Sequence, residues 1–216
     1  IEQHVSRVVL LSTDKAVAPI NLYGSTKSLA EKLSIRANGL SPHGTEFSVV
    51  RYGNVTGSRG SVVPYWKQLI SDGKPLRLTD DRMTRFWISL NDAVQAAWYT
   101  MEHVNRGTIV VPHLAAYRLT DLGKALAWAD YPWDIIGIRP GEKVGEMLIT
   151  PEEMQRSVFL SPNDYGIQPI APSWGGGAIP ANAVTFFDAK TEAWTYQSDT
   201  WPFRHNAQAL QKLLVS

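Results

Sequence analysis

The chain has 216 residues, of which 44% are hydrophobic and 19% are charged, and its formal net charge is +1. This composition is typical of a globular protein, contains no basic segment for nucleic acid, and offers no apolar run near the ~20 residues that span a bilayer. The absence of cysteine excludes disulfides and thiolate sites and fits a reducing compartment. We therefore expect a cytoplasmic protein without a nucleic-acid or membrane partner. The five histidines show no ligand spacing, so we expect no metal.

The first part of the chain alternates between strand and helix patterns. Residues 8–11 are apolar and partly β-branched, which predicts a parallel strand covered on both faces. Residues 25–38 predict a helix with Leu29 and Leu33 on its buried stripe, and residues 47–52 predict a second buried strand. Strand, helix and strand in this order indicate a βαβ unit.

The rest of the chain predicts shorter elements. The patterns favour helices at 64–72, 89–104 and 119–130, strands at 74–78 and 107–112, and a C-terminal amphipathic helix within 201–214. Thr120 and Asp121 are expected to cap the third of these helices. Prolines and glycines cluster at 161–185, which predicts an irregular loop. Trp87 and Trp98 are expected to pack inside a smaller second domain.

Two opposite charges and a Tyr–Lys pair follow the first predicted strand. Thr13, Asp14 and Lys15 come at its carboxyl end, where ligands bind in open α/β sheets. Tyr23 and Lys27 are four residues apart and share one helix face. A nearby ammonium favours the phenolate form of a tyrosine, so such a pair can remove a hydroxyl proton. Each residue alone also fits a structural role, but together they favour catalysis.

The segment LLSTDKAVAPINLYGSTKSLAEKL resembles the active-site segment of extended short-chain dehydrogenase/reductases. It is most similar to the UDP-N-acetylglucosamine 4,6-dehydratases (inverting) of the polysaccharide biosynthesis protein family. The similarity continues in VVRYGNVTGSRGSVVPYW, LTDDRMTRFWISLNDAV, IRPGEKVGEML and TYQSDTWPFRHNAQALQKLL. Five motifs in the same order are far more specific than any one of them.

The resemblance implies an α/β fold, namely the C-terminal part of a doubly wound NAD(P)-binding Rossmann domain plus a small α/β substrate-binding cap. Residues 1–60 would hold the Rossmann part, 61–160 mainly the cap with interleaved Rossmann elements, and 161–216 an irregular loop and tail. The glycine-rich turn that binds pyrophosphate is absent from the sequence. We therefore expect most of the cofactor site to lie outside this chain. The chain alone is expected to be inactive, and to be completed by an N-terminal half or to form a homo-oligomer.

The resemblance also implies a reaction on a UDP-sugar. Tyr23 would take the proton of the C4 hydroxyl while hydride leaves C4 for the cofactor. Lys15 would then remove the C5 proton, Asp14 would protonate the departing C6 oxygen, and Thr13 would orient the sugar. The cofactor would be NAD or NADP, and its binding residues are implied to be Ser12, Tyr23 and Lys27.

A second set of residues is implied to bind the substrate. Asn54 would reach a phosphate or the sugar amide, and Glu142 would accept hydrogen bonds from the uridine ribose. Arg85 and Arg139 are diphosphate candidates because a guanidinium matches phosphate geometry, and Arg59 belongs to a glycine-rich segment that can offer N–H groups to an anion. A structural ion pair is an equally good reading of each charged residue.

Two other functions remain open. A UDP-sugar 4-epimerase of the same superfamily is a near alternative, although Lys15 argues against it because an epimerase removes no water. A non-catalytic nucleotide-sugar-binding module is the alternative from a different class.

Overall fold

The computed structural model describes residues 5–41, 44–128, 130–161, 164–175, 196–200, 202 and 204–215. The chain divides into two compact units, each assembled from three segments. Unit 1 comprises Ile1–Tyr52, Asn91–His113 and Met147–Tyr196, and unit 2 comprises Gly53–Leu90, Leu114–Glu146 and Gln197–Ser216.

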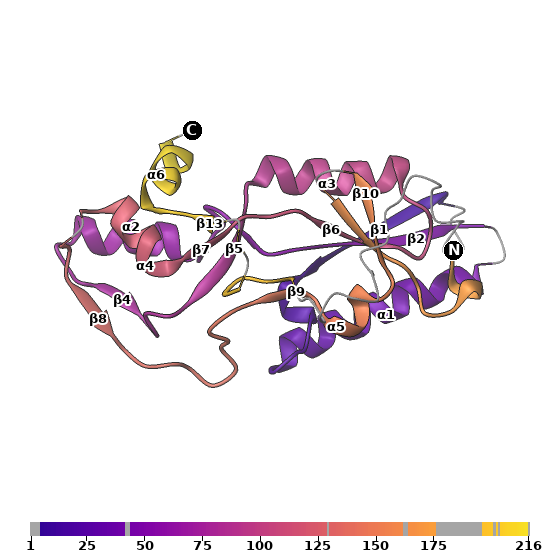
Figure 1. The fold of residues 1–216 in the computed structure, drawn as a ribbon, viewed down its shortest axis with the longest axis horizontal. Coiled ribbons are helices and arrows are strands. Elements are labelled where there is room, and N and C mark those ends of the chain that lie inside the picture. Colours follow the sequence, from indigo (N-terminus) through magenta and orange to yellow (C-terminus); the bar gives the residue numbers. More distant parts are fainter. Residues whose placement is uncertain are drawn as a thin grey trace. The chain divides into compact units, whose positions relative to one another are not determined.

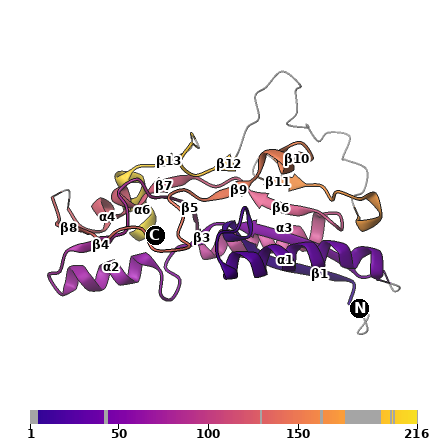
Figure 2. The same cartoon turned by 90° about the horizontal axis from the view of Figure 1, so that it is seen from below.

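Unit 1 is built on a five-stranded sheet with the strand order β1-β2-β6-β11-β10. Its first three strands are parallel, whereas β11 runs antiparallel to β6 and to β10. Figure 2 shows β6, β11 and β10 next to one another. The strands are Arg7–Thr13 (β1), Glu46–Tyr52 (β2), Ile109–Pro112 (β6), Ser157–Ser161 (β10) and Asp164–Ile167 (β11). A separate pair joins Met147–Ile149 (β9) and Tyr196–Gln197 (β12).

Helices cover both faces of the parallel strands in unit 1. Helix α1 (Leu22–Ala37) lies on one face and α3 (Leu90–His103) on the other, as Figure 1 shows. A short helix, α5 (Pro151–Met154), follows β9, and 3-10 turns occupy Asp14–Ala16, Asn38–Leu40 and Pro172–Trp174. The predicted βαβ unit is confirmed as β1-α1-β2, and the α/β class with it.

Helix α1 begins three residues before the predicted start. Asn21 is its N-cap, and the Asn21 side-chain oxygen accepts a hydrogen bond of 2.8 Å from the Gly24 amide. This bond satisfies one of the amides that lack an intrahelical partner at a helix start. The cap therefore sets the boundary at Leu22.

The predicted buried stripe of α1 is wrong. Leu29 and Leu33 are 57% and 60% exposed, whereas Glu31 and Ile35 are buried. The buried face of α1 instead contains Glu31, because Glu31 Oε2 forms an ion pair with Arg51 Nη2 of β2 at a distance of 2.7 Å. A hydrophobic pattern cannot reveal such a buried charge.

The first strand is less covered than predicted. Val8 and Leu11 are 37% and 48% exposed, so β1 is not buried on both faces. In the described part of the chain β1 has one neighbouring strand, β2, and therefore forms an edge of the sheet. An open edge offers unpaired backbone groups to a further strand.

The segment predicted as an irregular loop is partly a strand. Asp164–Ile167 pairs with β6 in an antiparallel register, in which Ile167 faces Ile109. The prolines and glycines that suggested a loop mostly follow this strand. Residues 176–185 of the predicted loop lie outside the described residues.

Unit 2 contains a four-stranded sheet in the order β13-β7-β5-β3 and a two-stranded sheet of β4 and β8. Its core is formed by apolar side chains from the helices α2, α4 and α6 and from these strands. The helices are Val62–Ser71 (α2), Leu119–Leu126 (α4) and Ala207–Val215 (α6). The strands are Asn54–Val55 (β3), Leu76–Leu78 (β4), Thr84–Ile88 (β5), Ala116–Arg118 (β7), Trp133–Ile135 (β8) and Arg204–His205 (β13).

All three predicted helices of unit 2 are confirmed. The predicted cap of α4 and the predicted position of Trp98 are wrong. Helix α4 has Arg118 as its N-cap, so Thr120 and Asp121 lie inside its first turn. Trp87 packs in the core of unit 2 as predicted, whereas Trp98 belongs to α3 and is 56% exposed. Among the described residues, no helix is both long and apolar enough to cross a membrane.

The pKa of Glu153 predicts how stability depends on pH. Burial opposes ionisation of this carboxyl, but the charge and hydrogen bonds of Arg51, with the Thr150 amide and Arg156, hold the pKa of Glu153 below its ordinary value of 4.5. A carboxyl whose pKa is lower in the folded state stabilises the fold above the unfolded-state pKa. We expect this contribution to be lost below about pH 4.5, as the pH falls through the folded-state value.

Glu153→Gln should remove that part of the pH dependence. Denaturant unfolding measured at intervals between pH 7 and pH 3 would check this, because the difference between wild type and variant isolates Glu153. Parallel curves for the two proteins across this range would contradict the prediction.

Candidate active site and nucleotide pocket

Three predicted catalytic residues meet at the carboxyl end of β1. The Thr13 hydroxyl donates a hydrogen bond of 2.8 Å to Asp14 Oδ1, and Lys15 Nζ lies 3.0 Å from the same oxygen. Asp14 is fully buried, while about a third of the Lys15 side chain is exposed (34%). Asp14 Oδ2 is buried and has no hydrogen-bond partner among the described residues. Asp14 and Lys15 are therefore close enough to exchange a proton, and the second carboxylate oxygen of Asp14 is enclosed by the protein.

The start of α1 brings the Tyr–Lys pair to the same end of β1. Lys27 Nζ donates a hydrogen bond of 3.0 Å to the Leu11 carbonyl, which ties the helix to the strand. Tyr23, one helical turn earlier, is 54% exposed. Burial, and secondly the Tyr23 phenol, raise the pKa of Tyr52. Tyr52 pairs with Thr13 in the sheet register.

A glycine allows α1 to approach the Asp14–Lys15 turn closely. A Cβ atom on Gly24 would lie 2.3 Å from the Lys15 carbonyl oxygen and 3.0 Å from Pro19 Cβ. The first of these distances is shorter than a Cβ contact can be, and the neighbour is backbone. The glycine after Tyr23 is therefore required by the packing of the helix on the turn.

The Ser12 hydroxyl is already engaged in the structure. Ser12 is buried, and its Oγ donates a hydrogen bond of 2.5 Å to Glu31 Oε1. Its assignment to the cofactor site stays a prediction.

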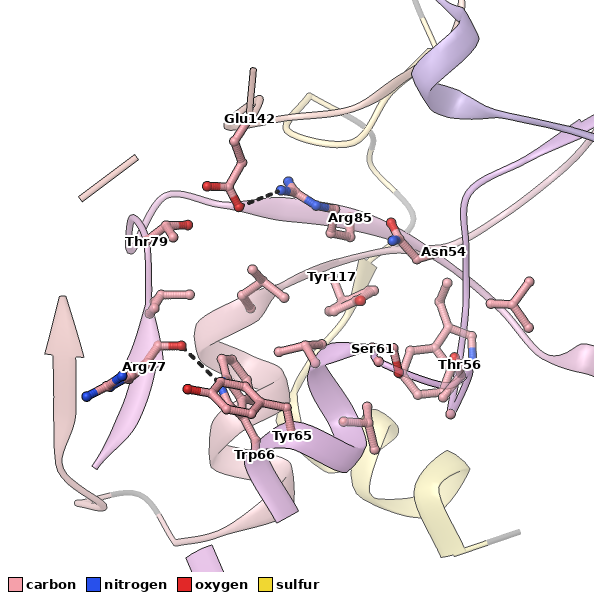
Figure 3. A pocket seen from close by; sticks show the side chains of 18 of the residues that line it. Asn54, Thr56, Ser61, Tyr65, Trp66, Arg77, Thr79, Arg85, Tyr117 and Glu142 are labelled. Carbon is pink, nitrogen blue, oxygen red and sulfur yellow. Dashed lines mark hydrogen bonds and ion pairs between the residues drawn. The ribbon is translucent and has the colours of Figure 1, made fainter. Parts of the chain in front are cut away.

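Unit 2 holds a pocket of about 480 Å³, within the range of small-molecule sites. Four of the five predicted substrate-binding residues line it, namely Asn54, Arg85, Arg139 and Glu142. Figure 3 shows Asn54, Arg85 and Glu142 around this pocket. Arg59 is exposed and is not among the lining residues, so its role stays a prediction.

Positive charge dominates the ionisable groups of the pocket. Three arginines, Arg77, Arg85 and Arg139, and one glutamate, Glu142, line it. Arg85 is nearly buried, donates to the Thr84 carbonyl at 2.7 Å, and lies 4.0 Å from Glu142 Oε1. The pocket is therefore suited to an anion larger than one carboxylate.

The N-terminus of α2 adds a second anion-binding feature. Gly60, Ser61 and Val62 line the pocket where α2 begins, and Gly57 and Gly60 adopt the left-handed conformation that glycine favours. The Ser61 oxygen is buried and has no hydrogen-bond partner among the described residues. Helix N-termini bind phosphate groups because their first amides lack partners and the helix dipole is positive there.

Several pocket residues were not predicted from the sequence. Tyr65 and Trp66 of α2 line the pocket, and Trp66 donates from its ring nitrogen to the Arg77 carbonyl at 2.9 Å (Figure 3). Thr79 and Tyr117 come from distant parts of unit 2. The sequence held one signal, the aromatic pair directly after the glycine-rich turn.

Comparison with known proteins identifies the family. A family model described as "Polysaccharide biosynthesis protein" matches residues 1–163. The chain belongs to this polysaccharide biosynthesis protein family. The chain is 46% identical over 170 residues to a UDP-N-acetylglucosamine 4,6-dehydratase (inverting) of Campylobacter jejuni, which covers 78% of this chain and 50% of the relative. It is also 45% identical over 169 residues to a UDP-glucose 4-epimerase of Rickettsia massiliae, covering 76% of this chain and 49% of that enzyme.

Solved structures confirm the fold class of this family member. The X-ray structure of Pen from Bacillus thuringiensis matches with a TM-score of 0.84 and 30% identity, over 100% of this chain and 63% of that one. A dTDP-glucose 4,6-dehydratase from Bacillus anthracis in complex with NAD matches with a TM-score of 0.55 at 16% identity, over 62% of this chain and 51% of that one, and supports the fold alone. The predicted Rossmann-type α/β class is thus confirmed. The chain spans about half the length of the curated relatives that it matches.

Proposed function

We propose that this chain is the catalytic and substrate-binding part of a UDP-N-acetylglucosamine 4,6-dehydratase that inverts C5 and serves surface polysaccharide or glycan biosynthesis. The observation that carries the proposal is the joined Thr13–Asp14–Lys15 cluster, with its distances of 2.8 and 3.0 Å to one carboxylate oxygen. Loss of water across C5 and C6 needs a base and an acid in addition to the base at the C4 hydroxyl, whereas epimerisation at C4 needs only the base at the C4 hydroxyl.

Tyr23, Lys15 and Asp14 each have one task in the proposed reaction. Tyr23 removes the proton of the C4 hydroxyl as hydride leaves C4 for the bound cofactor, and the C4 ketone so formed makes the C5 proton acidic. Lys15 removes that C5 proton, and Asp14 donates a proton to the C6 oxygen, which leaves as water. C6 would then regain the hydride and C5 a proton, so that the cofactor ends in its starting oxidation state. Because Asp14 and Lys15 are in contact, they can exchange a proton and reset the site after each turnover.

The residues of unit 1 fit one part of a nicotinamide cofactor site. Lys27, which donates a hydrogen bond to the Leu11 carbonyl of β1, would hold the nicotinamide ribose, and the exposed Tyr23 phenol precedes it by one turn. The bound cofactor, NAD or NADP, supplies reversible hydride transfer. The sequence contains no glycine-rich pyrophosphate turn, so this chain is proposed to bind cofactor tightly only when an N-terminal half completes the domain.

The pocket of unit 2 is proposed to bind the nucleotide diphosphate of the substrate. Arg85 and Arg139 would bond the phosphates, the amides at the start of α2 and the Ser61 hydroxyl would complete the anion site, and Glu142 would accept from the ribose hydroxyls. The volume of about 480 Å³ suits a ligand of this size.

Arg139→Ala should weaken the affinity of the chain for UDP about 10- to 100-fold. This is the loss expected when one hydrogen bond to a charged group is removed. Arg139 is exposed, so its removal leaves the fold of unit 2 intact. Arg118→Ala is the matched control, because Arg118 is also exposed in unit 2 but does not line the pocket. Isothermal titration calorimetry with UDP compares the three proteins. Equal affinities in all three, or no UDP binding by the wild-type chain, would contradict the proposed nucleotide site.

The epimerase alternative predicts a different product. With UDP-N-acetylglucosamine, a dehydratase forms a 4-keto-6-deoxy sugar, whereas an epimerase returns a sugar that keeps its C6 hydroxyl. Proton NMR of the product distinguishes them by the C6 methyl doublet.

A further inference from the structure

A buried arginine in unit 1 binds two carboxylates at once. Arg51 donates from Nε and Nη2 to Glu31 at 3.0 and 2.7 Å, and from Nη1 and Nη2 to Glu153, both at 2.9 Å. Nη1 also donates to the Leu148 carbonyl at 2.8 Å. All five N–H groups of the guanidinium thus have an acceptor. Burial alone would lower the pKa of Arg51, but the two carboxylates raise it, so the arginine stays charged.

The hydrogen bonds of Arg51 and Glu31 extend to β1 and α1, which lie next to or contain the proposed catalytic groups. Glu31 accepts the hydrogen bond of Ser12, the residue directly before Thr13 at the end of β1. Glu31 also lies four residues after Lys27 and eight after Tyr23, so all three share one face of α1. The carboxylate of Glu31, on α1, therefore binds side chains of both β1 and β2, namely Ser12 and Arg51.

A buried ion pair of this kind contributes little net free energy to folding, because removing its charges from water is costly. Well-packed apolar side chains in its place often stabilise a protein equally, whereas the best-attested use of buried polar groups is to fix a register. The bidentate contact of Arg51 with Glu31 restrains both sliding and rotation of α1, because a planar pair of hydrogen bonds is geometrically specific.

We propose that Glu31 and Arg51 are positioning residues, which fix α1 against the carboxyl end of β1 and so set Tyr23 and Lys27 relative to Asp14 and Lys15. The effect on turnover rests on the proposed function, but the fixing of α1 does not. Glu153 binds the same arginine from α5 and touches neither β1 nor α1 through these bonds. It therefore offers a matched comparison, since Glu31→Gln and Glu153→Gln each remove one carboxylate charge from Arg51.

The first test needs no activity. The full chain is labelled with 3-fluorotyrosine, and the ¹⁹F resonance of Tyr23 is assigned with Tyr23→Phe. We expect Glu31→Gln to shift or broaden this resonance and Glu153→Gln to leave it in place. If Glu31→Gln does not fold, Glu31→Asp, which keeps the charge and withdraws it by one methylene, should give the same shift. An unchanged Tyr23 resonance in the folded Glu31 variant, or equal changes in both carboxylate variants, would overturn the proposal.

The second test uses the chain completed by an N-terminal half of a related dehydratase. Glu31→Gln should lower kcat about 10- to 100-fold, the effect of displacing a catalytic group by about 1 Å. The KM for UDP-N-acetylglucosamine should change by less than about twofold, because the network contributes no residue to the nucleotide pocket. Glu153→Gln should leave both constants nearly unchanged at a temperature where it is folded. Equal losses of kcat in the two variants would show a purely structural network and overturn the proposal. A completed enzyme without any turnover would count against the proposed function, while the ¹⁹F result would still decide the positioning role.

Discussion

Replacing Tyr23 with phenylalanine is expected to lower the turnover of the completed enzyme about 10²- to 10⁴-fold, the usual contribution of a general base. The substitution removes one oxygen atom and keeps the ring. Because Tyr23 is 54% exposed, the loss of its hydroxyl leaves no buried group unsatisfied, and stability should hardly change. Steady-state kinetics with UDP-N-acetylglucosamine measures the effect, which should fall on kcat rather than on KM.

Tyr52→Phe is the matched control for this prediction. Tyr52 is a half-buried tyrosine of unit 1, whose pKa is raised by burial and secondly by the Tyr23 phenol. It is the last residue of β2 and does not belong to α1, and its raised pKa makes it a poor source of phenolate. Turnover of Tyr52→Phe should stay within about threefold of wild type, a small fraction of a general-base effect. Full turnover in Tyr23→Phe, or a larger loss in Tyr52→Phe, would contradict the assignment of the base.

Gly24→Ala is expected to have the largest effect on the fold of unit 1. The added Cβ would lie 2.3 Å from the Lys15 carbonyl oxygen, so either α1 or the Asp14–Lys15 turn must move. Overpacking against backbone costs about 1–3 kcal/mol and sometimes more. Since the same movement separates Tyr23 from the turn, turnover should also fall about 100-fold, the effect of a displacement near 1 Å.

Gly39→Ala provides the control for the glycine substitution. Gly39 follows α1, and its added Cβ would lie 2.7 Å from the end of the flexible Arg36 side chain, which can move aside, and 3.4 Å from the Ser173 carbonyl oxygen. Urea unfolding should therefore show a much smaller loss for Gly39→Ala than for Gly24→Ala. Equal losses would mean that the contact of Gly24 with the turn does not limit the packing of α1.

The regular part of the fold was predictable because its hydrophobic patterns are local. The run at 8–11, the helix pattern after it and the run at 47–52 were enough to predict β1-α1-β2. The face of α1 was not predictable, because the burial of Glu31 depends on Arg51, twenty residues away in the sequence. Strand β11 was missed because its pairing with β6 is non-local and the sequence around it is rich in proline and glycine.

Some residues of the candidate site could also be predicted from the sequence, and others could not. The spacing of Tyr23 and Lys27 and the position of Asp14 and Lys15 after a strand could be read directly, because each depends on a few adjacent residues. The substrate residues came from the family resemblance, and Asn54, Arg85, Arg139 and Glu142 all line one pocket. Thr79 and Tyr117 were missed because nothing local marks them, and only the fold of unit 2 brings them to the same pocket as the glycine-rich segment that ends at Ser61.

Lys15 and Asp14 are proposed to carry out loss of water from a nucleotide sugar. NMR in heavy water can follow UDP-N-acetylglucosamine after an N-terminal Rossmann half from a related dehydratase has been supplied to the chain. We expect a 4-keto-6-deoxy product with deuterium at C5 and inverted C5 configuration, and no product from Lys15→Ala. A folded, cofactor-loaded complex that forms no product, or one in which Lys15→Ala is as active as wild type, would contradict this proposal.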